Sequence, residues 1–352
     1  MGKSKALRQG LIRFCGPNGP LEPKPDLIAS IYLTITTFQT RIGEPKQRDS
    51  QRLSCTLLMF APIRKYAINH RTHYEYSSPS SLCHNQMHLR PRDLPYQNVH
   101  QSCVEVSPSP DSRSQWIDSF GNRAEFFSIE KLHPHLTVTS KSIVERSEPD
   151  YQIDQSPTWE QVTQSANQPH GDDDRQASEF VFDSRHCKRG STFIDFARDV
   201  AVDHRSFVEC VRLLTAKIYR QMEYSPDATQ VSTKPAEALA RRQGVCQDFA
   251  QIAICCLRSL GVPARYVSGY LLTHPAPGKE KLIGADASHA WFSAYAGSLG
   301  WIDFDPTNNL IPGLEHITVA WGRDYADVSP IHGVFVGGGF TQLSVSVDVQ
   351  PI

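Results

Sequence analysis

The sequence has no long apolar run and no strong net charge. Of its 352 residues, 39% are hydrophobic and 21% are charged, and the formal net charge is −1. Its longest apolar stretches, residues 54–62 and 252–257, are much shorter than the roughly 20 residues that a membrane-spanning helix needs. A nearly neutral chain has no general attraction for nucleic acids or anionic membrane surfaces. We therefore expect neither nucleic acid nor membrane as a partner.

The cysteines do not form a disulfide pattern. There are nine, an odd number, and no Cys-x-x-Cys pair occurs, so at least one thiol is expected to be free. The basic residues near the N-terminus are not followed by the sustained apolar segment of a secretory signal. These features predict a cytoplasmic protein whose free thiols are mostly buried.

Composition divides the chain into four stretches. Residues 1–58 are rich in Gly, Pro, Lys and Arg, and we expect a disordered or non-native N-terminal extension, with Met59 as a possible natural start. Residues 59–146 hold short strand-like segments between turn residues, which predicts a small β-rich domain. Residues 147–189 are polar and are predicted to be a linker. Residues 190–352 are predicted to form a second globular domain.

A cysteine stands at the predicted start of a buried helix. Residues 249–260 are apolar on nearly every side, which indicates a central helix, and Gly261 is suited to end it. Cys246 lies at its start, where the positive end of the helix dipole favours a nucleophilic thiolate and backbone N–H groups can form an oxyanion hole. Taken alone, a cysteine in the position of Cys246 is more often a small core residue after a glycine turn, which is how we interpret Cys255 and Cys256.

A histidine and an aspartate follow on a predicted hairpin. His289 begins the strand HAWFSAY, and after a short glycine-containing turn the strand WIDFD ends at Asp305. Pairing about this turn places His289 opposite residue 305 or 306, beside the Asp305 carboxylate. Such a carboxylate fixes the imidazole tautomer and stabilises the imidazolium of a thiolate–imidazolium pair. Asp303 lies on the same face but is expected nearer Phe292, so it ranks second.

Three other patterns are weaker candidates. Neither His133-Pro-His135 nor Cys83-His84 has a partner pair at the spacing of a tetrahedral site, so we predict no metal and no cofactor. The glycines at 337–339 lack the Lys-Ser/Thr of a phosphate-binding loop and precede a strand-like run, which predicts a turn.

The segments around these residues resemble the transglutaminase-like superfamily, in the bacterial branch with a β-rich N-terminal region. The resemblance rests on RRQGVCQDFA, GVPARYVSGY, DASHAW and GWIDFDPTNN, on HITVAWGRDYADVSP after them, and on HRTHYEYSSPSSLCHNQMHLRPR from His70. It implies an α+β, papain-like catalytic core at 190–352, in which a helix packs the cysteine against an antiparallel sheet, after the small β-rich domain. Cys246 matches the nucleophile, His289 the base and Asp305 the orienting acid.

Four further residues are candidates for the surroundings of this site. Tyr224 could donate its hydroxyl to an oxyanion. Trp291 and Trp301 match aromatic positions of the family and are expected either in the core or in a wall of the cleft. Asp303 remains the alternative acid.

The resemblance implies an enzyme that acts on amide bonds through a Cys-His-Asp triad and a thioester intermediate. Hydrolysis of the thioester by water gives a peptidase or amidase, which we favour, and attack by an amine gives transglutaminase-type acyl transfer. The partners are then a peptide or protein amide substrate and, for acyl transfer, an amine acceptor. A non-catalytic scaffold with the same fold is the alternative, against which the presence of all three triad residues argues. The sequence does not indicate an oligomeric state.

Overall fold

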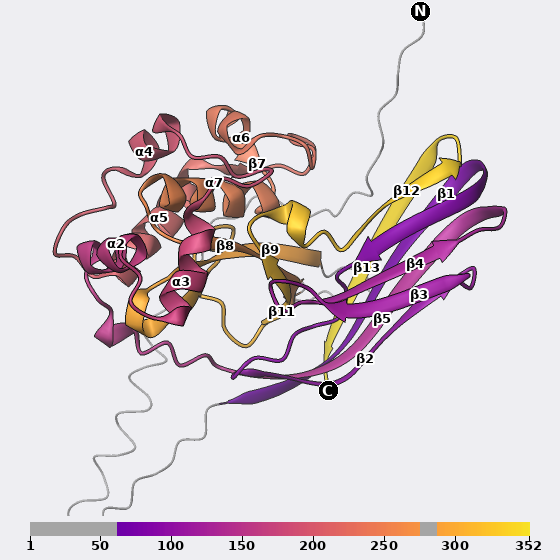
Figure 1. Cartoon of the computed structure of the whole chain (residues 1–352), viewed down its shortest axis with the longest axis horizontal. Helices are drawn as coiled ribbons and strands as arrows, with labels where there is room; N and C mark the ends of the chain where they lie inside the picture. Colours follow the sequence, from indigo (N-terminus) through magenta and orange to yellow (C-terminus); the bar gives the residue numbers. More distant parts are fainter. Residues whose placement is uncertain (1–61, 275–286) are drawn as a thin grey trace, which may run out of the picture. The chain divides into compact units, whose positions relative to one another are not determined.

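The computed structural model describes residues 62–274 and 287–352, all of which belong to one compact unit. Helices and strands are mixed along the chain, and two antiparallel sheets account for most of the strands (Figure 1). The α+β class predicted from the sequence is therefore confirmed. The extension predicted at residues 1–58 lies outside the described residues.

The larger sheet is built around one long strand. Its members are β1 (Ile63–Met87), β2 (Gln97–Ser107), β3 (Ser112–Ile117), β4 (Arg123–Ile129), β5 (His133–Ser147), β12 (Ile331–Gly337) and β13 (Thr341–Pro351). Along its first part β1 pairs with β5 and β13, and along its last part with β4 and β12. The β-rich region near the start of the described chain is thus completed by strands that follow residue 330, as the indigo and yellow arrows of Figure 1 show.

Alternation in the sequence explains why β1 and β5 form a sheet with one buried face. In β1 every second residue from Tyr66 to Thr72 is buried, and in β5 the same holds from Leu136 to Arg146. Successive side chains of a strand point to opposite faces, so this period of two places one row in the core and the other row outward. The domain boundaries at residues 146 and 189 stay predictions.

Helices precede and accompany the smaller sheet. They are α2 (Trp159–Asn167), α3 (Asp172–Ser178), α4 (Ser191–Ala197), α5 (Phe207–Gln221), α6 (Pro235–Arg241) and α7 (Cys246–Ser259), with short 3₁₀ turns η2 (Ile153–Gln155), η3 (Glu179–Val181), η4 (Gly297–Leu299) and η5 (Tyr325–Asp327). The predicted linker at 147–189 contains α2 and α3. Among the described residues, no helix has the length and apolar character needed to cross a membrane.

The smaller sheet and α7 form the framework of the candidate site. Its strands, in the order β10-β9-β8-β11, are β10 (Trp301–Phe304), β9 (Ala287–Tyr295), β8 (Ala264–Leu271) and β11 (His316–Gly322). The helix α7 packs against β8 and β9 and is also in contact with α4, α5 and α6. The helix α7 is therefore enclosed, as its continuous apolar sequence predicts. Gly261, just after its end, has a φ of +80°, which is the left-handed conformation expected there.

Candidate active site

Cys246 is the first residue of α7. Directly before it lies the short strand β7 (Gln243–Gly244), which pairs in parallel with β6 (Glu223–Tyr224). The Asp248 carboxylate accepts hydrogen bonds from the Val245 N–H (2.9 Å) and the Thr229 hydroxyl (2.6 Å), which ties the start of the helix to the loop between β6 and α6. This anchoring fixes the first turn of α7, which carries both Cys246 and the free N–H groups of the helix start.

The exposure of Cys246 sets it apart from the other cysteines of α7. Cys255 and Cys256 are fully buried, whereas Cys246 is only partly buried. Burial raises the pKa of the Cys256 thiol, which keeps that thiol protonated and unreactive. The sequence-based interpretation of Cys255 and Cys256 as packing residues agrees with their positions.

The hairpin brings His289 and Asp305 together, although its register differs from the prediction by one residue. Phe304 pairs with Phe292, and Asp303 pairs with Ser293 instead of lying near Phe292. The difference arises in the connection, where η4 occupies three residues before β10 begins. Asp305 follows the last pair of the ladder, and its side chain reaches along the sheet to accept a hydrogen bond from His289 Nε2 at 2.8 Å.

Asp305 is fully buried and accepts hydrogen bonds at both oxygens. Oδ1 accepts from the backbone N–H groups of Thr307 (2.9 Å) and Asn308 (3.2 Å). Oδ2 accepts from His289 Nε2, from the Asn308 side-chain amide (2.7 Å) and from His316 Nε2 (3.0 Å). Burial alone would raise the pKa of this carboxyl, but the His289 charge and these donors hold it well below its usual range. The group is therefore a fixed carboxylate.

The charge of Asp305 determines the state of His289, which is 7% exposed. Burial lowers the pKa of His289, but the Asp305 carboxylate and the Cys246 sulfur outweigh burial and raise the pKa to about 10. Because Nε2 donates to Asp305, Nδ1 is the ring nitrogen available to the Cys246 thiol. A hydrogen bond with this thiol is one of the interactions that raise the pKa of His289. The arrangement favours an imidazolium next to the sulfur.

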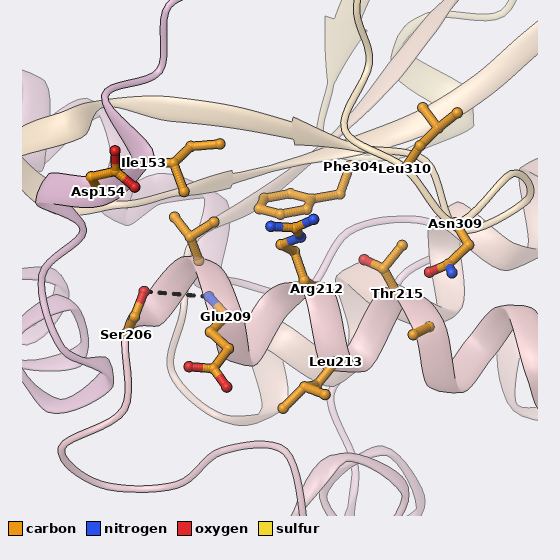
Figure 2. Close-up of a pocket in the computed structure, with 12 residues that line it drawn as sticks. Ile153, Asp154, Ser206, Glu209, Arg212, Leu213, Thr215, Phe304, Asn309 and Leu310 are labelled. Atoms are coloured by element: carbon orange, nitrogen blue, oxygen red, sulfur yellow. Dashed lines mark hydrogen bonds between the residues drawn. The ribbon is translucent and has the colours of Figure 1, made fainter. Parts of the chain in front are cut away.

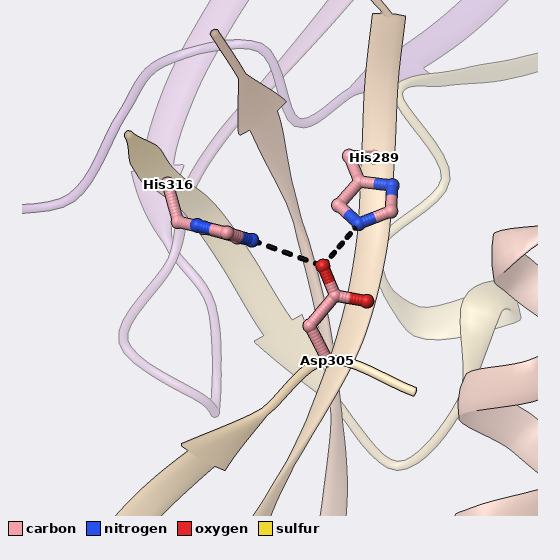
Figure 3. A group of neighbouring side chains, drawn as sticks. All are labelled: His289, Asp305 and His316. Atoms are coloured by element: carbon pink, nitrogen blue, oxygen red, sulfur yellow. Dashed lines mark hydrogen bonds and ion pairs between the residues drawn. The ribbon is translucent and has the colours of Figure 1, made fainter. Parts of the chain in front are cut away.

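His316, at the start of β11, was not identified from the sequence. Figure 3 shows its ring and that of His289 pointing from two strands toward the same oxygen of Asp305. Its strand pairs with β8, placing His316 opposite Leu271. The only sequence signal was its place in the segment HITVAWGRDYADVSP, and a strand pairing between residues 45 positions apart has no local signature.

The other four candidates occupy different environments. Tyr224 is 37% exposed, and burial together with the charge of Cys246 raises its pKa, so it lies near the thiol. Trp291 is fully buried and contacts the rings of both His289 and His316, with centroid distances of 6.1 and 5.3 Å. It supports the imidazoles from within the core and forms no part of a cleft surface.

Trp301 and Asp303 lie further along the hairpin. The Trp301 ring stacks on the Arg265 guanidinium at 4.3 Å. Asp303 is 3% exposed and accepts a hydrogen bond from the Ser293 hydroxyl, and its charge acts on Arg265. Both residues therefore belong to a buried polar cluster around Arg265, and no hydrogen bond links Asp303 to His289 among the contacts of the described residues.

One group of potential metal ligands occurs in the part of the chain that the structure describes. His289, Asp305 and His316 have ligand atoms within 4.8 Å of one another, while His133, His135, Cys83 and His84 form no such group. Ligands of a tetrahedral zinc ion lie about 3.3 Å apart, since each is about 2.0–2.1 Å from the metal. The separations of 2.8 and 3.0 Å are those of hydrogen bonds, which suits carboxylate–imidazole chemistry.

A separate cavity of about 580 Å³ lies against α5, and Figure 2 shows the residues around it. It borders the turn after β10 through Asn309 and Leu310, and the backbone of Leu310 exchanges hydrogen bonds with that of Asp305 (2.9 and 3.3 Å). Cys246 and His289 do not line it. Its relation to the site is thus only through the turn that shapes Asp305.

Comparison with known proteins agrees with the resemblance in the sequence. The bacterial transglutaminase-like N-terminal region matches residues 66–145, and the transglutaminase-like superfamily core matches residues 194–306. An uncharacterized protein of Mycobacterium tuberculosis (strain ATCC 25618 / H37Rv) is 37% identical over 303 residues, which are 84% of this chain and 95% of the relative. A relative in Mycobacterium leprae is 34% identical over 287 residues, 80% of this chain and 96% of that one.

Two further proteins are similar over different extents. A solved structure of a protein from Cytophaga hutchinsonii, proposed there to be a cysteine protease, has a TM-score of 0.64 at 21% identity and covers 83% of this chain and 92% of its own. A protein-glutamine gamma-glutamyltransferase of Pseudomonas aeruginosa is 32% identical over 96 residues, 26% of this chain and 14% of that protein. The matches to both regions, the long mycobacterial relatives and the shared fold lead to one conclusion: the chain belongs to the transglutaminase-like superfamily.

Proposed function

We propose that this protein is an enzyme that cleaves or transfers amide bonds with Cys246 as its nucleophile, His289 as acid and base, and Asp305 as the orienting carboxylate. The observation that carries the proposal is the 2.8 Å hydrogen bond from His289 Nε2 to the buried Asp305, which leaves the other ring nitrogen for a thiol at the start of α7. A buried His70, which has no carboxylate partner among the described residues, has its pKa lowered to about 4 by burial, so the contrast with His289 is due first to Asp305 and then to Cys246.

The reaction follows from the proton positions. The Cys246 proton moves to His289 Nδ1, and the thiolate attacks the amide carbon to give a tetrahedral oxyanion. The Cys246 N–H in the first turn of α7 donates to this oxyanion, and Tyr224 is our candidate for the second donor. His289 then protonates the departing amine, the carbon–nitrogen bond breaks, and an acyl thioester remains on Cys246.

The thioester can be resolved in two ways. When water attacks, His289 takes a proton from it, the carbon–sulfur bond breaks, and a carboxylic acid leaves, which is the peptidase or amidase reaction that we favour. When a primary amine attacks, His289 takes a proton from it, the carbon–sulfur bond breaks to release Cys246, and a new amide forms. The similarity to the Pseudomonas glutamyltransferase supports keeping this second outcome. The substrate in both cases is a peptide or protein amide. A cytoplasmic location stays a prediction from the sequence.

Thiol reactivity provides the first test. Cys103 is exposed and Cys246 is partly buried, so accessibility alone predicts faster alkylation of Cys103. If Cys246 forms an ion pair with His289, iodoacetamide at pH 6.5 modifies Cys246 at least about tenfold faster than Cys103, as measured by mass spectrometry of peptides after timed quenching. Equal or slower modification of Cys246 would contradict the proposal and favour a non-catalytic scaffold.

Activity provides the second test. The wild-type protein and Cys246→Ala are incubated with a peptide library, with and without a primary amine, and products are identified by mass. We expect cleavage products from the wild type alone, and amine adducts if acyl transfer dominates. Cys256→Ala, at a fully buried position in the same helix, is the matched control and is expected to retain activity.

A further inference from the structure

His316 shares an acceptor atom with the proposed base. Oδ2 of Asp305 lies 2.8 Å from His289 Nε2 and 3.0 Å from His316 Nε2, and all three side chains are buried (Figure 3). Each Nε2 must carry a proton to donate to this oxygen. The carboxylate is therefore held between two imidazole donors, one from β9 and one from β11.

The two rings differ in charge. Burial lowers the pKa of His316, and the positive charges of His289 and of Arg146 from β5 lower it further, against the opposing effect of Asp305. The pKa of His289 is instead raised. At neutral pH the His289 imidazolium faces the Asp305 carboxylate, and His316 is a neutral ring. His316 therefore orients the carboxylate through its hydrogen bond without neutralising its charge.

The strand that carries His316 is fixed by side chains of the larger sheet region. The Gln97 side-chain amide accepts from the Thr318 N–H (2.9 Å) and donates to the Thr318 carbonyl (2.8 Å). In the same way, Asn122 accepts from the Trp321 N–H (3.0 Å) and donates to its carbonyl (2.8 Å). Both amides are buried. They satisfy backbone groups of β11 that an edge strand would otherwise leave open, and so they hold the strand in place.

From this arrangement we propose that His316 is a positioning residue, which holds Asp305 in the orientation that keeps the His289 imidazolium next to Cys246. The inference rests on the proposed function, because it assigns a role to His316 in the same site. A neutral N–H donor on β11, a strand that Gln97 and Asn122 hold in place, restricts the rotation of the Asp305 carboxylate more than a water molecule would. Loss of this donor removes one of the three hydrogen bonds to Oδ2 and leaves only the Asn308 amide to oppose rotation of that oxygen away from His289, while Oδ1 stays bonded to the Thr307 and Asn308 N–H groups and the charge in the site is unchanged.

The test compares His316→Phe, which keeps a ring but removes the donor, with His316→Gln, which keeps a neutral N–H donor. The alkylation rate of Cys246 by iodoacetamide is measured from pH 5 to 10 in the full chain. For His316→Phe we expect the midpoint of the rate profile to move up by about one pH unit and the rate at pH 6 to fall about tenfold, since a hydrogen bond to a charged group is lost. His316→Gln is expected to stay within about threefold of the wild type.

The outcomes separate this inference from the proposed function. If wild-type Cys246 reacts no faster than Cys103, the proposed function itself fails. If wild-type Cys246 is fast and His316→Phe leaves the midpoint unchanged, the positioning role is overturned while the function stands, even when the variant melts at a lower temperature. Should Phe not fit, His316→Leu replaces it in the same assay. If neither His316→Phe nor His316→Leu folds, and His316→Gln does not keep the wild-type midpoint, His316 is assigned to structure alone.

Discussion

Replacing Asp305 by Asn should convert His289 from a cation to a neutral ring. The structure contains its own reference for this change, because His70 is as deeply buried as His289 but bonds only the hydroxyls of Tyr270 and Thr72. Burial lowers the pKa of His70 to about 4, whereas that of His289 is about 10. If Asp305→Asn brings His289 close to the value of His70, the cationic fraction at pH 7 falls to about 10⁻³.

The assay for this change is the pH profile of Cys246 alkylation. Without an imidazolium beside it, the thiol should behave as a free cysteine, with a midpoint at about pH 8.5 and a rate at pH 6 at least about tenfold lower than in the wild type. Asp303→Asn is the matched control, since Asp303 bonds Ser293 in the neighbouring buried cluster. A profile of Asp305→Asn that coincides with the wild type would refute the electrostatic reasoning.

The same variant should alter how stability depends on pH. The folded-state pKa of His289 is raised, so its stabilising contribution is complete below about pH 6.5, the value of an unfolded histidine, and is lost as the pH rises toward about 10. Urea unfolding of the wild type should therefore show declining stability between pH 6.5 and 9.5. In Asp305→Asn this decline should disappear, because the carboxylate no longer outweighs burial, which lowers the pKa of His289.

Three further changes test other contacts. Gly269→Ala would place a Cβ 2.2 Å from the Ile317 carbonyl oxygen and 2.4 Å from the Trp291 ring, so we expect a loss of about 1–3 kcal/mol in urea unfolding and weaker activity through the displaced Trp291. Gln97→Leu leaves the Thr318 N–H unpaired and its carbonyl with the Arg92 N–H (3.3 Å) alone, and should lower the free energy of unfolding by about 1–3 kcal/mol, with Gln97→Glu retaining the acceptor and falling between. Tyr224→Phe should reduce kcat by about tenfold or more with little change in KM if its hydroxyl binds the oxyanion, and an unchanged kcat would exclude that role.

Local sequence signals were sufficient for the parts of the site that lie close together in the chain. The apolar run after Cys246 and the glycine at 261 predict α7 and its end, and helix and glycine both lie where expected. The two strands around a short turn predict the proximity of His289 and Asp305, because a hairpin joins them over 16 residues. The register was off by one residue since the length of the 3₁₀ turn cannot be read from composition.

Contacts between distant segments were not predictable in this way. His316 reaches Asp305 only because β11 pairs with β8, and the edge of β11 is completed by Gln97 and Asn122, about 200 residues earlier. An amide side chain that caps a strand has no pattern of its own, since the same residue types occur on any surface. Such long-range polar contacts depend on the assembled fold.

The pairing of β1 with β13 has a consequence for how the protein is made. Tyr66 pairs with Pro351 and Tyr76 with Thr341, which lie 285 and 265 residues further along the chain, so during translation one edge of β1 stays unpaired until almost the whole chain has been made. An unpaired strand edge of eleven consecutive residues can pair with strands of other chains and so cause aggregation. Shortened versions that stop before residue 331 would carry every proposed catalytic group and still be expected to precipitate, for want of the two strands that close the sheet.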